Sequence, residues 1–152
     1  MILTIGAYNM FKWKFTESVE TDATPEQIWS LWENVDTWPL WDKEISWVKL
    51  NGPFLVGTQG QMKPADGPKV NFTLTEVEKN KKFTDRAKLP LTTMDFSHVY
   101  HVSNSNSRKS SIQHSVEMEG FLAPVFGFII GRKIKKHLKQ AMIDLSNQAI
   151  EK

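Results

Sequence analysis

The chain has 152 residues, of which 40% are hydrophobic and 24% are charged, which is the composition of one ordinary globular domain. It contains no cysteine, which excludes a disulfide framework, a thiolate nucleophile and a cysteine-based metal site. A chain without cysteine also fits a reducing compartment, so we expect a cytoplasmic protein.

The net charge is only +2, but positive charge is concentrated near the carboxyl end. Residues 121–152 carry six lysines and arginines against two acidic residues, which leaves the rest of the chain negative. A basic segment suits anionic lipid or nucleic acid, although it is more often a solvated face. Six tryptophans could stack on bases, but no RNA-binding motif or phosphate-binding glycine loop accompanies them. We therefore expect no nucleic-acid partner.

Residues 1–10, MILTIGAYNM, are apolar but lack the cationic start and small-residue cleavage site of a signal peptide. Met10 directly precedes the first convincing strand. We therefore interpret residues 1–10 as an N-terminal extension and residues 11–152 as a single domain. The apolar run FLAPVFGFIIG at 121–131 is too short to span a bilayer.

The first predicted element is a strand over residues 11–22, in which Trp13, Phe15 and Val19 fall on one side. Glu17 falls on that same side. A helix start follows the strand.

In this helix start, Thr24 is the expected cap, Pro25 takes the first helical position and Gln27 completes a capping box. Asp36 is expected to cap a second short helix that carries two tryptophans.

Six further segments have β-branched or aromatic residues at alternating positions, with turn signals between them. They span residues 45–50, 54–63, 69–78, 82–89, 93–103 and 109–119. Short connections between consecutive strands favour an antiparallel meander. Helical spacing returns over 121–150, where a broad apolar stripe must be buried against the sheet.

This order of one strand, two short helices, six strands and one long helix predicts an α+β helix-grip fold. A curved antiparallel sheet of six to seven strands would hold the long C-terminal helix packed across it. A lipocalin-like barrel would not insert two helices after its first strand, and a cystatin-like cone would place its long helix before most strands.

Several stretches resemble the START-like superfamily, also called helix-grip or birch-pollen-allergen-like, and within it the bacterial polyketide cyclase/dehydrase and lipid-transport group. The resemblance covers residues 11–150 and implies the same fold with an internal cavity. It leaves the activity open, because the superfamily includes carriers, hormone receptors, cyclases, hydroxylase partners and chaperone activators. The matching stretches are SVETDATPEQIW at 18–29, VDTWPLW at 35–41, GTQG at 57–60, FSH at 96–98, SIQHSV at 111–116 and GFLA at 120–123.

Alternation along the strands predicts which side chains line the space between sheet and helix. This apolar lining with few polar atoms suits a small hydrophobic molecule, such as a lipid, an aromatic polyketide or a sterol-like compound. The alternative is that the side chains meet and fill the centre, and the tryptophans pack the short helices. The predicted ligand-binding residues are Trp41, Phe72, Phe96, His98, Tyr100, His114, Met118, Phe126 and Ile130.

The candidate catalytic residues are His98, His114 and Glu17. Both histidines interrupt apolar faces, where desolvation lowers the pKa and leaves neutral imidazoles that donate and accept hydrogen bonds. Each could orient a ligand carbonyl or hydroxyl, remove a proton in an aldol-type cyclisation, or be a hydrogen-bonded core histidine. Glu17 needs a partner such as Arg86 or a histidine if it faces inward, and points to water if the strand slips by one residue. The spacing follows no metal-ligation motif, so we predict no metal and no cofactor.

Three functions therefore stay open: a non-enzymatic carrier or sensor of a small hydrophobic ligand, a polyketide cyclase or dehydratase that uses a cavity histidine, and a peripheral membrane lipid-handling protein. We favour the first, and so the interpretation without enzyme activity. The helix from Phe121 to Ile130 is apolar almost all round. Burial by the short helices explains this, and the alternatives are a ligand gate, a dimer contact or transient contact with a membrane. The residues give no indication of the oligomeric state.

Overall fold

The computed structural model describes residues 11–106 and 109–151. The prediction that residues 1–10 form an extension lies outside these described residues. The first strand and three short helical segments are β1 (Lys12–Thr21), α2 (Pro25–Glu33), η1 (Val35–Thr37) and α3 (Trp38–Trp41). Six strands follow: β2 (Ile45–Leu50), β3 (Gln59–Pro64), β4 (Val70–Glu78), β5 (Lys82–Leu89), β6 (Thr92–His101) and β7 (Ser110–Gly120). The final helical stretch consists of α4 (Ala123–Phe126), η2 (Gly127–Gly131) and α5 (Arg132–Glu151).

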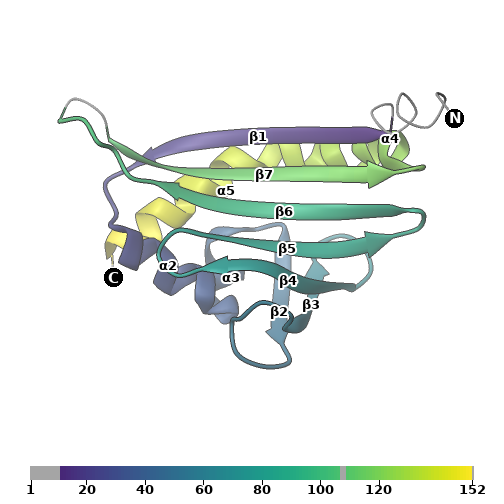
Figure 1. Ribbon diagram of the computed structural model, residues 1–152, viewed down its shortest axis with the longest axis horizontal. Helices are drawn as coiled ribbons and strands as arrows, with labels where there is room; N and C mark the ends of the chain where they lie inside the picture. Colours follow the sequence, from purple (N-terminus) through teal and green to yellow (C-terminus); the bar gives the residue numbers. More distant parts are fainter. Residues whose placement is uncertain (1–10, 107–108, 152) are drawn as a thin grey trace, which may run out of the picture.

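The strands form one antiparallel sheet in the order β1-β7-β6-β5-β4-β3-β2. Consecutive strands from β2 to β7 are therefore neighbours, and β1 pairs with the last strand. Figure 1 shows the C-terminal helix lying across one face of the sheet, with α2 and α3 near its C-terminal end. This arrangement confirms the predicted helix-grip fold, with the two short helices placed after the first strand.

The start of α2 confirms the predicted capping box. Thr24 Oγ1 accepts a hydrogen bond from the backbone N–H of Gln27 at 3.2 Å, and Gln27 Oε1 accepts one from the N–H of Thr24 at 2.8 Å. Pro25 occupies the first turn, where its missing N–H leaves no hydrogen bond unmade.

The predicted cap at Asp36 is wrong. Asn34 stands two residues earlier, and its Oδ1 accepts from the backbone N–H of Asp36 at 3.3 Å. Thr37 already has helical backbone angles, so the chain runs from η1 into α3 without an extended capping residue. Asn34 therefore caps η1, and α3 begins without a side-chain cap.

The predicted strand over residues 54–63 is shortened to β3. Residues 51–57 form a turn, in which Leu55 N–H donates to Pro53 O at 2.9 Å and Gly57 has a φ of 93°. Pro53 cannot donate to a sheet ladder, and a positive φ ends an extended segment.

Two glycines bring the C-terminal helix unusually close to β1. Gly127 and Gly131 lie four residues apart in η2, and a Cβ added at either would stand 2.5 Å from the indole ring of Trp13. The ring therefore lies flat against the helix backbone, which only glycine permits. We call this part of the interior, formed by Trp13, Gly127, Gly131, Phe126 and Ile130, the glycine end.

The other end of the C-terminal helix is fastened by buried hydrogen bonds. Thr21 Oγ1 and Ser146 Oγ lie 2.6 Å apart, which joins the end of β1 to α5. Tyr100 Oη donates to Ala23 O at 2.7 Å and joins β6 to the start of α2.

Within the described residues, no helix combines the length and the hydropathy needed to cross a bilayer.

Candidate ligand-binding site

The inner face of the sheet carries three successive rows of cross-strand neighbours. One row, read from β1 to β4, is Glu17, His114, His98, Phe83 and Val77. The next row is Phe15, Val116, Phe96, Asp85 and Leu74. The third, nearest to α4, is Trp13, Met118, Met94, Ala87 and Phe72. Of these three rows, the first two carry the charged and imidazole side chains, and the third carries none.

The two histidines form a buried pair at the centre of the first row. Their ring centroids are 4.4 Å apart at an interplanar angle of 72°, so the edge of one ring faces the other. His98 also stacks on Phe83, with centroids 4.0 Å apart and ring planes only 6° apart. Both side chains are buried, with exposed fractions of 4% for His98 and 1% for His114.

Tryptophans from the short helices close over this pair. The ring of Trp32 in α2 lies 6.0 Å from each of the two imidazoles, and the ring of Trp41 in α3 lies 6.1 Å from His114. Both tryptophans are buried. We call the cluster of His98, His114, Trp32, Trp41 and Phe83 the imidazole end.

Both imidazoles are held neutral by their surroundings. Burial lowers the pKa of His114 to about 3. Burial also lowers the pKa of His98 well below its ordinary value, the neighbouring His114 acts in the same direction, and a backbone hydrogen bond at Phe83 opposes them. A neutral imidazole keeps one N–H donor and one acceptor nitrogen, so the pair can serve either a carbonyl or a hydroxyl group.

Four nitrogens of the imidazole end are buried without a hydrogen-bond partner. They are Trp32 Nε1, Trp41 Nε1, His98 Nδ1 and His114 Nε2. An unpaired buried polar atom costs about 1–3 kcal/mol, so native structures rarely keep one without a bound water or ligand. Four such atoms on rings that touch one another mark this cluster as a place for a polar group.

Asp85 is a polar residue of the inner face that the sequence analysis missed. It lies between Phe96 and Leu74 in the second row, its side chain is partly buried, and it has no salt bridge to another described residue. Burial raises the pKa of Asp85 to about 7, and the nearby Asp95 adds to this shift. The alternation of Phe83, Asp85 and Ala87 in the sequence was the signal that could have found it.

Asp85 is also close to the histidine pair. It is the diagonal neighbour of His98 across β5 and β6, since Phe83 is the residue directly opposite His98. Diagonal neighbours in an antiparallel pair have Cα atoms about 7–8 Å apart, within reach of one ligand. The inner face therefore offers a carboxyl group that changes protonation near neutral pH beside two neutral imidazoles.

Glu17 lies on the inner face, directly opposite His114, in a register that runs through β1 without a shift. Its Oε1 accepts from the N–H of Ser18 at 3.3 Å, and its side chain is partly buried. The suggested partner Arg86 instead binds Asp95 on the outer face, through contacts of 2.7 and 2.8 Å. Among the described residues Glu17 makes no ion pair with a histidine either.

The remaining predicted ligand-binding residues fall into two groups. Trp41, Phe72, Tyr100 and Met118 are buried within the core. Trp41 and Phe72 pack with Trp38, which agrees with the alternative that the tryptophans pack the short helices. The hydroxyl of Tyr100 already donates a hydrogen bond to Ala23 O. Inward-facing side chains that keep partial exposure, and so lie where water reaches the inner face, are Phe96, Phe126, Ile130, Met94 and Ile134.

One of the explanations left open for the apolar start of the C-terminal helix does not hold. The short helices do not bury it, because Val125, Phe128 and Ile129 are exposed. The short helices lie instead beside α5 near its C-terminal end, as Figure 1 shows.

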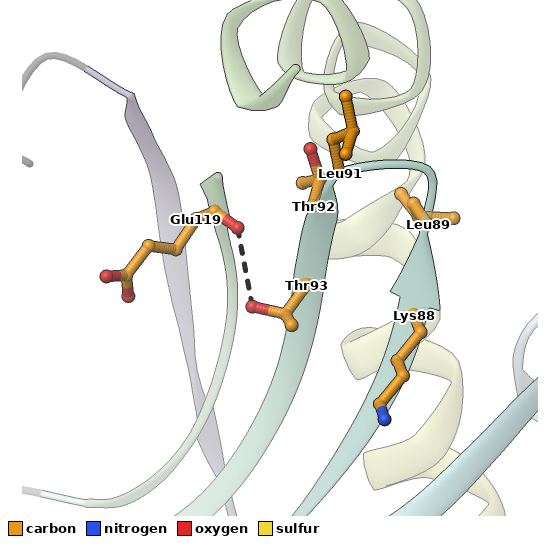
Figure 2. A pocket seen from close by; sticks show the side chains of 6 residues that line it. All are labelled: Lys88, Leu89, Leu91, Thr92, Thr93 and Glu119. Carbon is orange, nitrogen blue, oxygen red and sulfur yellow. Dashed lines mark hydrogen bonds between the residues drawn. The ribbon is translucent and has the colours of Figure 1, made fainter. Parts of the chain in front are cut away.

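Two hollows in the described surface lie away from the inner face. One of about 320 Å³ is at the turn between β5 and β6, and Figure 2 shows its lining, in which Thr93 Oγ1 donates to Glu119 O at 3.4 Å. The other, of about 860 Å³, lies over β3, β4 and β5. Its lining includes polar residues such as Gln61, Asn71 and Arg86, and also Gly60 and the predicted ligand-binding residue Phe72. A cavity between helix and sheet stays a prediction. Across residues 11–106 and 109–151, no group of three or more acidic or histidine side chains is arranged to hold a metal ion.

Solved structures with the same fold are numerous. The di-domain ARO/CYC StfQ from the steffimycin biosynthetic pathway matches with a TM-score of 0.76 at 9% identity, over 97% of this chain and 53% of that one. This chain thus spans about half the length of StfQ. Ara h 8.0201 matches with a TM-score of 0.70 at 10% identity, over 93% and 99% of the two chains. A point mutant of norcoclaurine synthase from Thalictrum flavum, in complex with a transition state analogue, matches with a TM-score of 0.67 at 16% identity. The match covers 92% of this chain and 95% of that one.

At these identities the solved structures establish the fold alone. No curated protein matches this chain. The model of a family described as "polyketide cyclase / dehydrase and lipid transport" matches residues 12–149, which is nearly the whole length. That description covers both enzymes and carriers of hydrophobic molecules. The chain belongs to the polyketide cyclase/dehydrase and lipid-transport family.

Proposed function

We propose that the protein binds a small hydrophobic molecule carrying a polar atom, and acts as its carrier or sensor. The observation that carries this proposal is the set of four unpartnered nitrogens at the imidazole end. A ligand hydroxyl or carbonyl that reaches them would satisfy atoms that are costly to leave bare. The family, which handles hydrophobic small molecules, supports an apolar body for the same ligand.

The ligand would lie along the second row of the inner face. Its apolar body contacts Phe96, Ile130 and Ile134, which are inward-facing and partly exposed. Its polar atom reaches His98 or Asp85, which are diagonal neighbours on paired strands. An aromatic or lipid-like molecule with a hydroxyl or keto group satisfies both requirements.

The test compares naphthalene with 2-naphthol, two probes that differ by one hydroxyl group. We expect 2-naphthol to bind about threefold to tenfold more tightly by fluorescence titration, since one buried hydrogen bond contributes about 0.5–1.5 kcal/mol. His98→Ala and His114→Ala should remove this difference. His101→Ala is the matched control, because His101 lies exposed on the outer face of β6 and its Nε2 contacts Gln113.

Equal affinity of the wild-type protein for the two probes would contradict the polar anchor. Absence of binding to both would contradict the ligand site itself. Mass spectrometry of the protein purified under native conditions from its own host would identify a ligand that copurifies.

A cyclase or dehydratase is the second candidate, and Asp85 is the observation that favours it. A carboxyl group with a pKa of about 7 can take up or release a proton at neutral pH, and a neutral imidazole lies nearby. In a dehydration, the Asp85 carboxylate would take the α-proton of a β-hydroxy ketone and pass it to the β-hydroxyl oxygen, so that the C–O bond breaks, a C=C bond forms and water leaves. A ring-fused β-hydroxy ketone gives an enone whose near-ultraviolet absorbance reports the reaction. Loss of turnover in Asp85→Asn with binding retained would favour the enzyme, and absence of turnover in the wild type would favour the carrier.

A further inference from the structure

The outer face of the first turns of the C-terminal helix exposes large apolar side chains. The exposed fractions are 66% for Phe121, 49% for Val125, 66% for Phe128 and 63% for Ile129. Val125, Phe128 and Ile129 lie three and four residues apart in the helix, and Phe121 lies in the turn directly before α4. Single exposed apolar residues are ordinary, but a contiguous group of this kind marks a contact surface.

The glycine end explains why these side chains face outward. Gly127 and Gly131 occupy the side of η2 that presses on Trp13, where any larger residue would clash with the indole ring. Phe126 and Ile130 pack inward beside the glycines, and Phe128 and Ile129, which take up the remaining side of η2, are turned away from the sheet. The exposure is a consequence of how the helix is packed and not of a loose segment.

The apolar surface continues onto the turn between β5 and β6. Leu91 is 71% exposed, and its carbonyl oxygen accepts from the backbone N–H of Phe121 at 2.9 Å. Figure 2 shows Leu91 at the rim of the hollow on this turn, next to the start of the C-terminal helix. On the other side, the ring of Phe11 lies 5.5 Å from that of Phe121. We call Leu91, Phe121, Val125, Phe128 and Ile129 the apolar tip.

The same side of the helix becomes cationic directly after the apolar tip. Arg132, Lys135, Lys136 and Lys139 are exposed and form no salt bridge with another described residue, and Lys135 Nζ also lies over the ring of Phe15, 5.1 Å from its centroid. The guanidinium carbon of Arg132 lies over the ring of Phe128, 5.1 Å from its centroid. Lys133 differs, since it binds Glu44 and Asp66. One helix face therefore changes from apolar to positively charged within about one turn.

We propose that the apolar tip and the four cations after it dock the protein on a bilayer that contains anionic lipid. Apolar side chains at the helix start would enter the boundary between headgroups and acyl chains, and the cations would meet the headgroup charges. The charge pattern selects this partner over a second copy of the chain, because two copies joined through this face would bring their unpaired cations together.

The experiment is co-sedimentation of the full chain with vesicles of phosphatidylcholine alone or mixed with phosphatidylglycerol. We expect binding to the mixed vesicles, weak binding to phosphatidylcholine alone, and loss of binding as salt rises. Phe128→Ser with Ile129→Ser should reduce the partition coefficient about tenfold or more, since two buried apolar side chains are removed. Val102→Ser with Leu40→Ser is the matched control, because both residues are comparably exposed away from the tip, at 63% and 62%.

The cationic part is tested separately with Lys136→Gln and Lys139→Gln, which should weaken binding to mixed vesicles about fivefold to tenfold. Lys49→Gln with Lys79→Gln removes the same charge from exposed positions elsewhere and should have little effect. Circular dichroism checks that each variant is folded. Binding that ignores lipid charge, or that falls equally in both serine pairs, would overturn the proposal. So would a concentration-dependent dimer in sedimentation velocity that Phe128→Ser disrupts while vesicles do not bind. The naphthol titration is independent of these outcomes.

Discussion

The imidazole end and the glycine end lie on the same inner face and are built from the same alternating strands, yet they are closed in opposite ways. At the imidazole end, tryptophans from α2 and α3 lie over the histidine pair. At the glycine end, the helix backbone itself descends onto Trp13 because two glycines remove the side chains between them. Large aromatic rings close one end, and the close approach of the helix backbone at two glycines closes the other.

This difference separates the two kinds of contact that the protein can make. Indole and imidazole rings bring polar nitrogens into the core, and four of them are left without a partner. The glycine end brings none, but Phe128 and Ile129 on the other side of η2 face outward. The proposed recognition of a polar atom therefore belongs to the inside of one end, and the proposed contact with a bilayer belongs to the outside of the other.

The largest expected effect tests whether the imidazole end is filled. Trp32 is completely buried and contacts Phe83 and both histidines, so Trp32→Ala should lower the free energy of unfolding by about 3–5 kcal/mol. Trp47→Ala is the control, since Trp47 is 39% exposed, and it should cost about 1 kcal/mol or less. Urea denaturation of both variants measures this. A small loss for Trp32→Ala would mean that this end is not tightly packed.

The next largest expected effect is the change that Asp85 causes in the pH dependence of stability. Its carboxyl group has a pKa of about 7 in the folded protein, against about 3.9 in the unfolded chain, so the folded state binds the proton more tightly. Stability therefore falls as pH rises from about 4 to about 7. Asp85→Asn lacks this loss, so its stability relative to the wild type should rise by about 2–4 kcal/mol between pH 4 and pH 8. Asp36→Asn, at an exposed position in η1, should follow the wild-type curve, and a parallel Asp85→Asn curve would contradict the burial.

The strands and the helix-grip order were predictable because alternation and turn signals are local properties. The inward positions of His98 and His114 follow from the same period of two residues, and so does that of Asp85. Asp85 was missed because a charged residue between Phe83 and Ala87 is easily taken for a solvent-facing one. Only the neighbouring strands fix which face of β5 is inside.

The closure of each end was not predictable from local patterns. Trp32 and Trp41 meet the histidines across more than fifty residues of sequence, and this meeting depends on how α2 and α3 lie on the sheet. The contact of Gly127 and Gly131 with Trp13 is equally distant. The sequence pattern marked the helix start as too apolar, but the glycine packing that turns it outward exists only in three dimensions.

For the histidine pair we expect a smaller change of stability with pH, in the opposite direction to that of Asp85. The pKa of His114 is lowered to about 3, so the folded state resists a proton that the unfolded chain accepts near pH 6.5. Stability should therefore fall as the pH drops from about 6.5 towards 3, by about 2 kcal/mol at pH 5 for this residue. His114→Asn should lose less stability than the wild type between pH 8 and pH 5, in thermal or urea unfolding. His101→Asn, changed on the outer face, should keep the wild-type dependence, and an unchanged slope in His114→Asn would place that imidazole in contact with water.

The glycine end is tested by filling it. Gly131→Ala puts a methyl group where the Trp13 ring lies 2.5 Å away, so the helix or the ring must shift, at a cost of about 1–2 kcal/mol in the free energy of unfolding. Gly52→Ala is the control, because the nearest atom to its Cβ would be Thr58 Cγ2 at an ordinary 3.6 Å. Trp13→Val combined with Gly131→Ala should recover part of the loss relative to Trp13→Val alone, since the smaller side chain leaves room for the methyl group. If Gly131→Ala were instead neutral or stabilising, as an alanine is in an unobstructed helix, the helix would stand farther from β1, and the outward turn of Phe128 and Ile129 would need another cause.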